Sequence, residues 1–143
     1  MQTKRGFTLI ELLVVLAVIG LLSTLAIVAV GSANRKARDI KRLSDLARIQ
    51  ASLNAYYIEQ NSYPVGKNVL LGVGNTRCLN LQGWAPAGCA NALMAQVPVP
   101  PDDVTPYIYN GSSSTYSVST ELEGDMEGLS GAIKVTPSAI LQQ

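Results

Sequence analysis

A single carboxylate stands inside the most apolar stretch of the chain. The run from Phe7 to Val30 contains Glu11 and no other charged side chain. An ionised group near the centre of a membrane costs about 2.5 to 3.5 kcal/mol or more on insertion scales, so an acid in such a run needs a partner. We therefore expect Glu11 to act by pairing with a positive charge.

The sequence offers little that could perform catalysis. It has no histidine to act as a general base and no phosphate-binding sequence of the GxxxxGK type. The serines from Ser112 to Ser114 have no visible activating partner. We therefore predict that the protein is not an enzyme and has no cofactor.

Two cysteines, Cys78 and Cys89, are the only ones in the chain. An even pair in a loop rich in glycine, asparagine and proline, beyond an export segment, predicts a disulfide in an oxidising compartment. Closing a loop of this size stabilises a fold by about 3 kcal/mol in the entropy model. Zinc is not expected, because two thiols without histidine lack the four ligands of a structural site. Two free thiols are the alternative.

An acidic run near the C-terminus supplies oxygen atoms of the kind that calcium binds. Its candidate ligands are Glu121, Glu123, Asp125 and Glu127. The run lacks the spacing of an EF-hand, and an ordinary solvated loop is the preferred interpretation. We therefore predict no metal.

A long helix must carry Glu11 and its apolar surroundings. The roughly 24 residues from Phe7 to Val30 span about 36 Å at a helical rise of 1.5 Å, enough to cross a membrane with some tilt. Beyond them, side chains recur at the three- and four-residue intervals of one apolar helix face: Ala33, Ala37, Ile40, Leu43, Leu46 or Ala47, Ile49, Leu53, and Tyr56 or Tyr57. One helix from about Thr8 to about Gln60 is predicted.

Charged pairs and two glycines give this helix its expected exposed faces and its expected flexible points. Arg35 with Asp39, and Lys41 with Asp45, stand four residues apart and are expected on exposed faces. Glycine costs about 1 kcal/mol relative to alanine inside a helix. Gly20 and Gly31 are therefore the points where we expect the helix to bend or partly unwind.

The residues from Lys4 to Glu11, KRGFTLIE, resemble the processing signature of type IV prepilins and of the related pseudopilins. The resemblance implies that a membrane peptidase cuts between Gly6 and Phe7, that Phe7 is then N-methylated, and that Glu11 aids assembly. A secretory signal peptide is the competing interpretation. It is disfavoured because the helical pattern continues past the apolar run without a convincing break.

Cleavage would create the partner that Glu11 needs. The free amine of Phe7 on one subunit and Glu11 on its neighbour would be opposite charges in a bundle of low dielectric constant. A buried pair need not add net stability, so its expected value is to fix register. The alternative is an isolated helix in which Glu11 reaches the headgroups or is neutral.

After Asn61 the sequence changes character. Pro64 disfavours helical geometry at the residue before it, and 65–101 is turn-rich with one short helical turn expected around 91–96. Strands are predicted at 107–109, 116–122 and 132–135, and Asn110-Gly111 is interpreted as turn chemistry rather than as a glycosylation site.

The expected fold class is α+β, with a long N-terminal helix whose C-terminal half packs on a small antiparallel sheet. The predicted parts are a leader, 1–6, a transmembrane and polymerisation helix, 7–30, its amphipathic continuation, 31–60, and a head, 61–143. In the head, a disulfide-containing loop region, 61–101, precedes the sheet, 102–143.

The resemblance implies a structural subunit of a type IV pilus, self-assembled into a helical homopolymer. The implied partners are the prepilin peptidase, an assembly platform with its ATPase, and the membrane before assembly. The implied location is a single pass in the cytoplasmic membrane with the N-terminus inside, followed by the cell-surface pilus. A count of basic side chains disagrees, because Arg35 to Arg42 outnumber Lys4 and Arg5.

Two alternatives remain at this stage. A pseudopilin of a type II secretion or competence system would share all of these features. A signal-anchored protein that binds a ligand such as DNA through Arg35 to Arg48 is the other. Asp39 and Asp45 interleave with those cations, so nucleic acid is not the expected partner.

The end of the chain is acidic, because Lys134 is the only basic residue after position 90. We therefore predict that this acidic surface of one copy lies near the basic helix of another.

Overall fold

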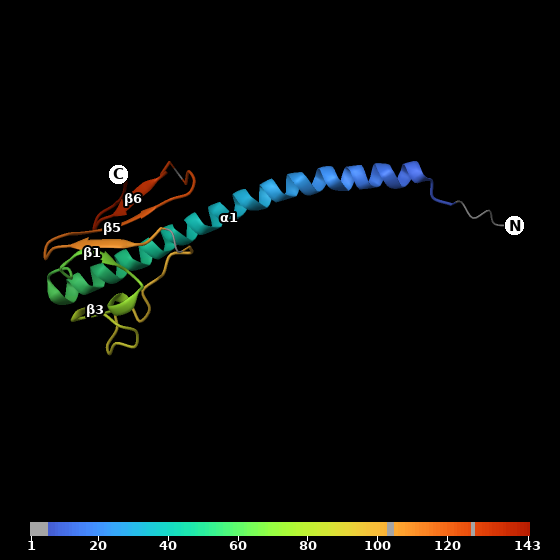
Figure 1. Ribbon diagram of the computed structural model, residues 1–143. Coiled ribbons are helices and arrows are strands. Elements are labelled where there is room, and N and C mark those ends of the chain that lie inside the picture. Colours follow the sequence, from blue (N-terminus) through green and yellow to red (C-terminus); the bar gives the residue numbers. More distant parts are fainter. Residues whose placement is uncertain (1–5, 103–104, 127) are drawn as a thin grey trace. The chain divides into compact units, whose positions relative to one another are not determined.

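The computed structural model describes residues 6–102, 105–126 and 128–143. Within them, helix α1 (Leu9–Gln60) precedes one five-stranded and one two-stranded antiparallel sheet, as Figure 1 shows. This architecture confirms the predicted α+β class. The chain divides into two compact units, Met1–Arg35 and Lys36–Gln143.

The first unit consists of the N-terminal segment and the apolar part of α1. This helix is long and apolar enough to cross a membrane. Two of its hydroxyl side chains bond to the helix backbone: Ser23 Oγ donates to the carbonyl of Ile19 and Thr24 Oγ1 to that of Leu21, both at 2.8 Å. Such bonds satisfy polar groups without a partner outside the helix. Gly20 and Gly31 are both helical, and their role as flexible points stays a prediction.

The second unit is built around the remainder of α1, which packs on the five-stranded sheet. Its strands are, in spatial order, β1 (Gly66–Leu70), β4 (Ile108–Gly111), β5 (Tyr116–Glu121), β6 (Ala132–Val135) and β7 (Ile140–Gln142). The smaller sheet pairs β2 (Cys78–Asn80) with β3 (Gly83–Ala85), and a short helix, η1 (Gly74–Thr76), precedes it.

The core lies between α1 and the inner face of the larger sheet. Alternation along the strands turns every second side chain inward, so that β5 buries Tyr116 and Val118 while Ser117 is only half-buried. The helix contributes Leu46 and Ile49, both fully buried. The large sheet therefore has an apolar inner face and an outer face that carries most of its polar residues, together with Ile108 and Leu141.

The predicted hairpin is confirmed, with a shift in where it turns. Gly111 of β4 pairs with Tyr116 of β5, so Asn110 and Gly111 belong to the strand and were wrongly interpreted as the turn. Glycine is required at this point because a Cβ would lie 2.5 Å from the carbonyl oxygen of Pro64. The Tyr109 hydroxyl donates to the same oxygen at 2.5 Å.

The region interpreted as turns contains strands that the sequence did not reveal. β1, β2 and β3 all lie before position 101, and β7 follows the last predicted strand. The helical turn expected around 91–96 is wrong, because Met94 forms a bridge with Leu79 and Asn91 has a φ of 51°. These short strands lack a clear alternating pattern, and pairing with distant residues decides their conformation.

The buried face of α1 also differs from the prediction near residue 40. Ala33, Ala37 and Ile40 are exposed, whereas Leu46, Ile49, Leu53 and Tyr56 are buried as expected. The same helix face continues toward the N-terminus through charged residues, Asp39, Arg42 and Asp45, all of them buried. The period was therefore predicted correctly, but two turns of the buried face are ionic.

Candidate functional site

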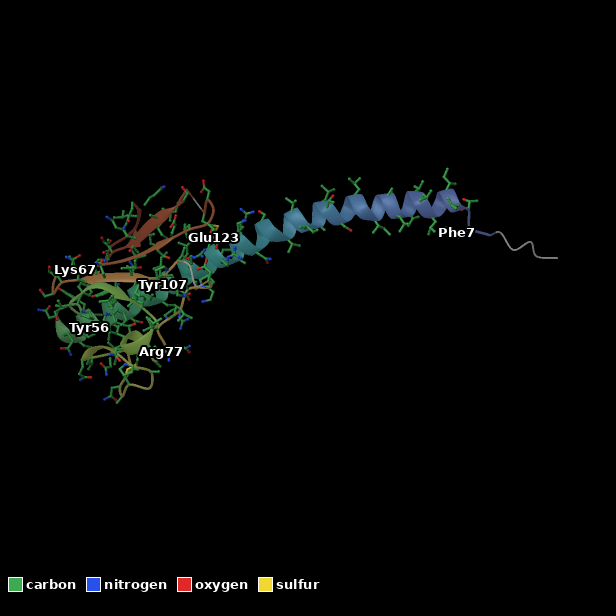
Figure 2. All side chains as sticks on the ribbon, in the orientation of Figure 1. Phe7, Tyr56, Lys67, Arg77, Tyr107 and Glu123 are labelled. Atoms are coloured by element: carbon green, nitrogen blue, oxygen red, sulfur yellow. A yellow bond between two sulfur atoms is a disulfide. The ribbon has the colours of Figure 1, made fainter. Side chains whose placement is uncertain are left out.

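The segment from Gly6 to Glu11 holds the residues that the sequence singles out for processing and assembly. Gly6, Phe7 and Thr8 are not helical, and α1 begins at Leu9. The Phe7 side chain is 83% exposed. The peptide bond between Gly6 and Phe7 therefore lies in non-helical chain just before the helix, and Figure 2 shows Phe7 at that end of α1.

Thr8 and Glu11 form a capping box at the start of α1. The Thr8 backbone N–H and hydroxyl donate to Glu11 Oε2 at 3.1 and 3.0 Å, and the Glu11 N–H donates to Thr8 Oγ1 at 3.3 Å. Such reciprocal bonds satisfy two backbone donors that a helix start otherwise leaves free.

Thr8 is a residue that our sequence interpretation missed. The pattern Thr-x-x-Glu ahead of an apolar run is the signature of a capping box and was available at residues 8–11. Within this single chain, Thr8 supplies the hydrogen bonds to the Glu11 carboxylate. The proposed pairing of Glu11 with the Phe7 amine of another copy stays a prediction.

A second group of ionisable side chains lies where the second unit begins. We name it the Arg42 cluster: Arg38, Asp39, Arg42, Asp102 and Glu123. Both Arg42 and Asp39 are buried, and Arg42 Nη1 donates to Asp39 Oδ1 at 2.6 Å and to Glu123 Oε1 at 2.9 Å. Arg42 Nη2 donates to Asp102 Oδ2 at 2.5 Å.

The Arg42 cluster joins α1 to two distant loops. Asp39 accepts hydrogen bonds from the backbone N–H of Glu123 at 3.0 Å and of Gly124 at 2.9 Å. Arg38 Nε donates to Glu123 Oε1 at 2.6 Å. The loop after β5 is thus held to the helix by side-chain and backbone bonds together, as Figure 2 shows for Glu123 beside α1.

A neighbouring carboxylate, Asp45, is held by two groups. Lys41 Nζ lies 2.8 Å from Asp45 Oδ2, and the hydroxyl of buried Tyr107 donates to the same oxygen at 3.0 Å. The predicted Lys41–Asp45 pair therefore exists, although its acid is buried. Asp39 pairs with Arg42 rather than with the predicted Arg35.

These contacts shift several pKa values. Hydrogen bonds from Arg38 lower the pKa of Glu123 to about 2, with Arg42 acting in the same direction. Burial would raise the pKa of Asp102, but hydrogen bonds from Thr105 and the charge of Arg42 bring it below its ordinary value. Burial and the charge of Asp45 raise the pKa of Tyr107, so its phenol keeps the proton that it donates.

Two carboxylates of the acidic run that was considered as a calcium site bind groups of the same chain. Glu123 is engaged by Arg38 and Arg42, and Asp125 Oδ1 accepts from the Gly128 N–H at 3.2 Å. Among the described residues, no group of three or more acidic or cysteine side chains gathers as a metal site would need. Glu127 lies outside the described residues, so the set that includes Glu121 stays untested.

The two cysteines form the predicted disulfide. Cys78 in β2 is bonded to Cys89, with their Cα atoms 6.1 Å apart. The bridge closes a loop that contains β3 and carries Trp84, whose ring packs edge-on against Tyr109 at a centroid distance of 5.2 Å. The disulfide therefore closes this segment on itself, and Trp84 packs the closed loop against a core tyrosine.

Comparison with known families bears on the N-terminal segment. The model of the prokaryotic N-terminal methylation motif matches residues 1–27. The chain carries a prokaryotic N-terminal methylation motif. The match confirms the resemblance predicted from KRGFTLIE, and the methylation motif extends into the apolar part of α1.

Relatives of the chain include two kinds of protein. Core protein G of the type II secretion system of Klebsiella pneumoniae is 36% identical over 64 residues, 45% of this chain and 46% of that protein. The Escherichia coli core protein G is 34% identical over 61 residues, 43% and 42% of the two chains. The type IV wide pilus major component PilA4 of Thermus thermophilus is 35% identical over 77 residues, 52% and 56%.

These similarities are partial. The chain spans about half the length of the curated relatives it matches. No solved structure shows a significant match to it. The family model therefore covers the N-terminal 27 residues, and the relatives match about half of the chain.

Proposed function

We propose that this chain is a structural subunit, similar to a major pilin, of a type IV pilus filament. The observation that carries the proposal is the methylation motif placed ahead of an apolar helix able to cross a membrane. The longer similarity to a wide-pilus component supports a pilus in particular. The role is structural rather than catalytic.

In this proposal, the prepilin peptidase removes the leader, 1–6, by cutting between Gly6 and Phe7, and Phe7 is methylated. The helix at 7–30 holds the subunit in the cytoplasmic membrane with its N-terminus inside. It then moves from lipid into the centre of a homopolymer at the cell surface. Segment 31–60 and the head, 61–143, form the outer part of each subunit. A separate ATPase and an assembly platform supply the energy.

Mass spectrometry of filaments sheared from the cell surface tests this proposal. The expected result is an N-terminal peptide that begins at Phe7 and carries one added methyl group. Such a peptide would establish processing and surface assembly together. A membrane-bound product with Met1 intact would overturn the proposal.

A pseudopilin of a type II secretion system is the second candidate. It is favoured by the similarity to core protein G of several bacteria. Deleting the gene and measuring both surface filaments and protein secretion distinguishes the two proposals. Loss of surface filaments with unchanged protein secretion supports the pilus, whereas loss of secretion with unchanged surface filaments supports the pseudopilin.

Binding of DNA along the basic part of α1 is not favoured. Arg38, Lys41 and Arg42 are engaged in ion pairs with carboxylates of the same chain. A protein gains affinity for DNA when its lysine and arginine side chains neutralise phosphates and release their counter-ions, so these side chains must be free to reach the phosphates. The contacts of these side chains therefore support a structural role for this helix face.

A further inference from the structure

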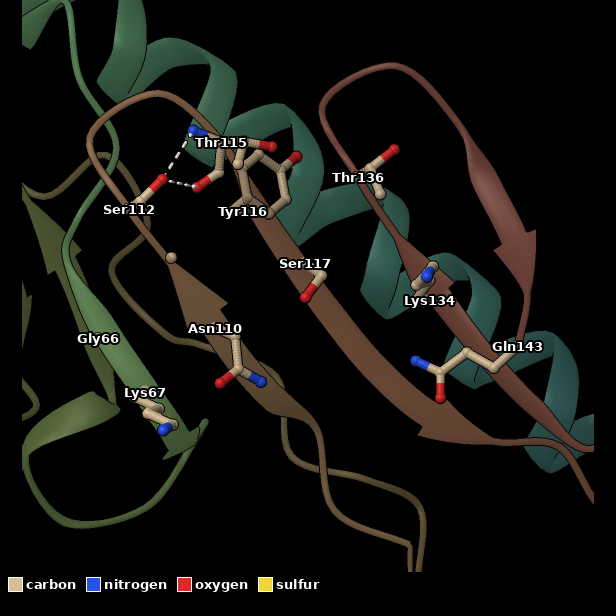
Figure 3. Close-up of a pocket in the computed structure, with 11 residues that line it drawn as sticks. Gly66, Lys67, Asn110, Ser112, Thr115, Tyr116, Ser117, Lys134, Thr136 and Gln143 are labelled. Atoms are coloured by element: carbon tan, nitrogen blue, oxygen red, sulfur yellow. Dashed lines mark hydrogen bonds between the residues drawn. The ribbon is translucent and has the colours of Figure 1, made fainter.

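The outer face of the five-stranded sheet carries an open hollow of about 590 Å³ (Figure 3). It lies on the side opposite α1, which is visible behind the strands. Residues of β1, β4, β5 and β6 line it, so four adjacent strands form its floor and margins. The hollow takes no part in the proposed processing or assembly.

Strand register explains why polar groups meet there. Asn110 of β4 pairs with Ser117 of β5, and Lys134 of β6 pairs with Ser119, the next outward residue of β5. Because their neighbours Tyr109, Val118 and Ile133 are buried, these side chains point outward. Figure 3 shows Lys67 and Lys134 on either side of Asn110 and Ser117.

The charged side chains that line the hollow are all basic. Lys67 and Lys134 line it, and none of its other described lining residues has a carboxylate side chain. Neither ammonium group forms an ion pair with any acid that the structure describes. Ser117 and the amide of Asn110 supply neutral donors and acceptors between the two cations, and the hydroxyl groups of Ser112 and Thr115 line the hollow nearer the turn that joins β4 to β5 (Figure 3).

The two lysines and the neutral polar groups around them favour one class of anionic ligand over another. Single-stranded nucleic acid is bound by many cations together with aromatic rings on which bases stack. The aromatic residue of the hollow, Tyr116, has its side chain buried with Tyr63 and Tyr109 in the core, so its ring is not offered to a ligand. Sugar rings carry several hydroxyl groups, and the neutral side chains of Asn110 and Ser117 are able to donate and accept hydrogen bonds with them.

We propose that this hollow binds an acidic polysaccharide whose sugar carboxylates pair with Lys67 and Lys134. Sugar hydroxyls hydrogen-bond to Ser117 and its neighbours on the floor. With two cations, one site binds weakly. A polymer of subunits would raise the overall affinity through repeated sites, but the site itself does not depend on polymerisation.

Binding of the detergent-solubilised full-length chain to immobilised polygalacturonate tests the proposal. Neutral dextran and single-stranded DNA serve as comparison ligands. Replacing both lysines, Lys67→Gln with Lys134→Gln, removes two charge-assisted contacts and is expected to weaken polygalacturonate binding about tenfold. The matched control Lys36→Gln removes an exposed lysine outside the hollow and should leave binding unchanged.

A neutral substitution separates the hollow from a general effect of charge. Ser117→Ala is expected to weaken binding about two- to fivefold, since one neutral hydrogen bond is lost and no charge changes. Asn110 is unsuitable because its side-chain oxygen accepts the Asn68 N–H at 2.8 Å. Thermal unfolding of each variant shows whether the fold is kept.

Three results would overturn the proposal. The first is no measurable binding of polygalacturonate by the unaltered chain. The second is equal weakening by Lys36→Gln and by the double lysine variant, which would indicate only general charge. The third is DNA binding as tight as polygalacturonate binding and dependent on the same lysines, which would indicate a nucleic-acid surface.

Discussion

At the scale of single residues, the chain uses charge in two different surroundings. Glu11 sits in the apolar first unit and is hydrogen-bonded by Thr8, whereas Arg42 is buried in the second unit among carboxylates. Burying an ion is costly unless its hydrogen bonds are satisfied. The buried charge of Arg42 therefore depends on a few carboxylate partners, and removing either side of such a pair should have a large effect.

Arg42→Met should strongly destabilise the second unit. The substitution keeps an unbranched side chain but leaves buried Asp39 without its ion-pair partner. A loss of about 3 to 5 kcal/mol in the free energy of unfolding is expected when one member of a buried pair is removed. Urea unfolding of the full-length protein in detergent measures it. Arg35→Met, at an exposed position, is the control, and similar midpoints for both variants would refute the structural role of Arg42.

The stability contributed by Glu123 of the Arg42 cluster should persist to low pH. The pKa of Glu123 is lowered from 4.5 to about 2, so the stability that it contributes is fully present above pH 4.5 and is lost as the pH falls through about 2. Melting temperatures from pH 7 to pH 2 measure this dependence. The difference between the unaltered chain and Glu123→Gln should stay constant down to about pH 4.5 and then shrink. A difference that vanishes above pH 5 would contradict the lowered pKa.

At the scale of elements, the ends and faces of α1 are fixed by different interactions. Its start is set locally by the capping box of Thr8 and Glu11. Its second part is held by the core and by Gln50, whose side-chain amide donates to the Thr136 carbonyl at 2.8 Å. Local and long-range contacts in the same helix can therefore be perturbed separately.

Thr8→Val should loosen the first turn of α1. Valine keeps the shape of threonine but removes the hydroxyl that bonds to Glu11 in both directions. Losing an N-cap costs about 1 kcal/mol, so amide exchange in the first turn should rise about fivefold. Hydrogen exchange in detergent micelles measures it. Thr8→Ser keeps the hydroxyl and should exchange at the original rate; equal rates in all three proteins would exclude the capping box.

The disulfide should stabilise the irregular segment around β2 and β3. Replacing both cysteines, Cys78→Ser with Cys89→Ser, is expected to lower the free energy of unfolding by about 3 kcal/mol, because the unfolded chain gains loop entropy. Urea unfolding measures the loss. Reducing the unaltered protein should produce a similar shift, and an unchanged midpoint in both cases would show that the bridge adds no stability.

At the scale of the whole molecule, the two units carry separate parts of the proposed function. The first unit has the methylation motif and an exposed apolar helix, and the second has its own core, ion pairs and disulfide. A change in the first unit should therefore affect assembly without unfolding the second.

Glu11→Ala should separate assembly from folding. Membrane insertion and the melting temperature of the second unit should stay unchanged, while incorporation into filaments falls about tenfold or more because the Phe7 amine of a neighbouring copy loses its counter-charge. Immunoblots of sheared filaments and of membranes measure the two pools. Glu59→Ala, which removes an exposed acid at the far end of α1, is the control. Normal incorporation of Glu11→Ala would place the acid's partner or purpose elsewhere.

Much of this protein follows from local sequence. The apolar run, the period of α1, the hairpin of β4 and β5 and the cysteine pair were all predictable, because each depends on neighbouring residues or on composition. Glu123 shows the limit: in the sequence it belongs to an acidic run, for which an ordinary solvated loop was preferred to a calcium site. Its actual partners, Arg38 and Arg42, lie more than 80 positions away.

The sequence by itself determined the methylation motif, the apolar helix and the α+β class, since side-chain periodicity and a short motif encode them. Only the tertiary structure decided which charges are buried, where β1, β2, β3 and β7 pair, and that Lys67 and Lys134 share one outer face. The physical reason is that burial and strand pairing join residues far apart in the chain. Neither can be read from spacing along it.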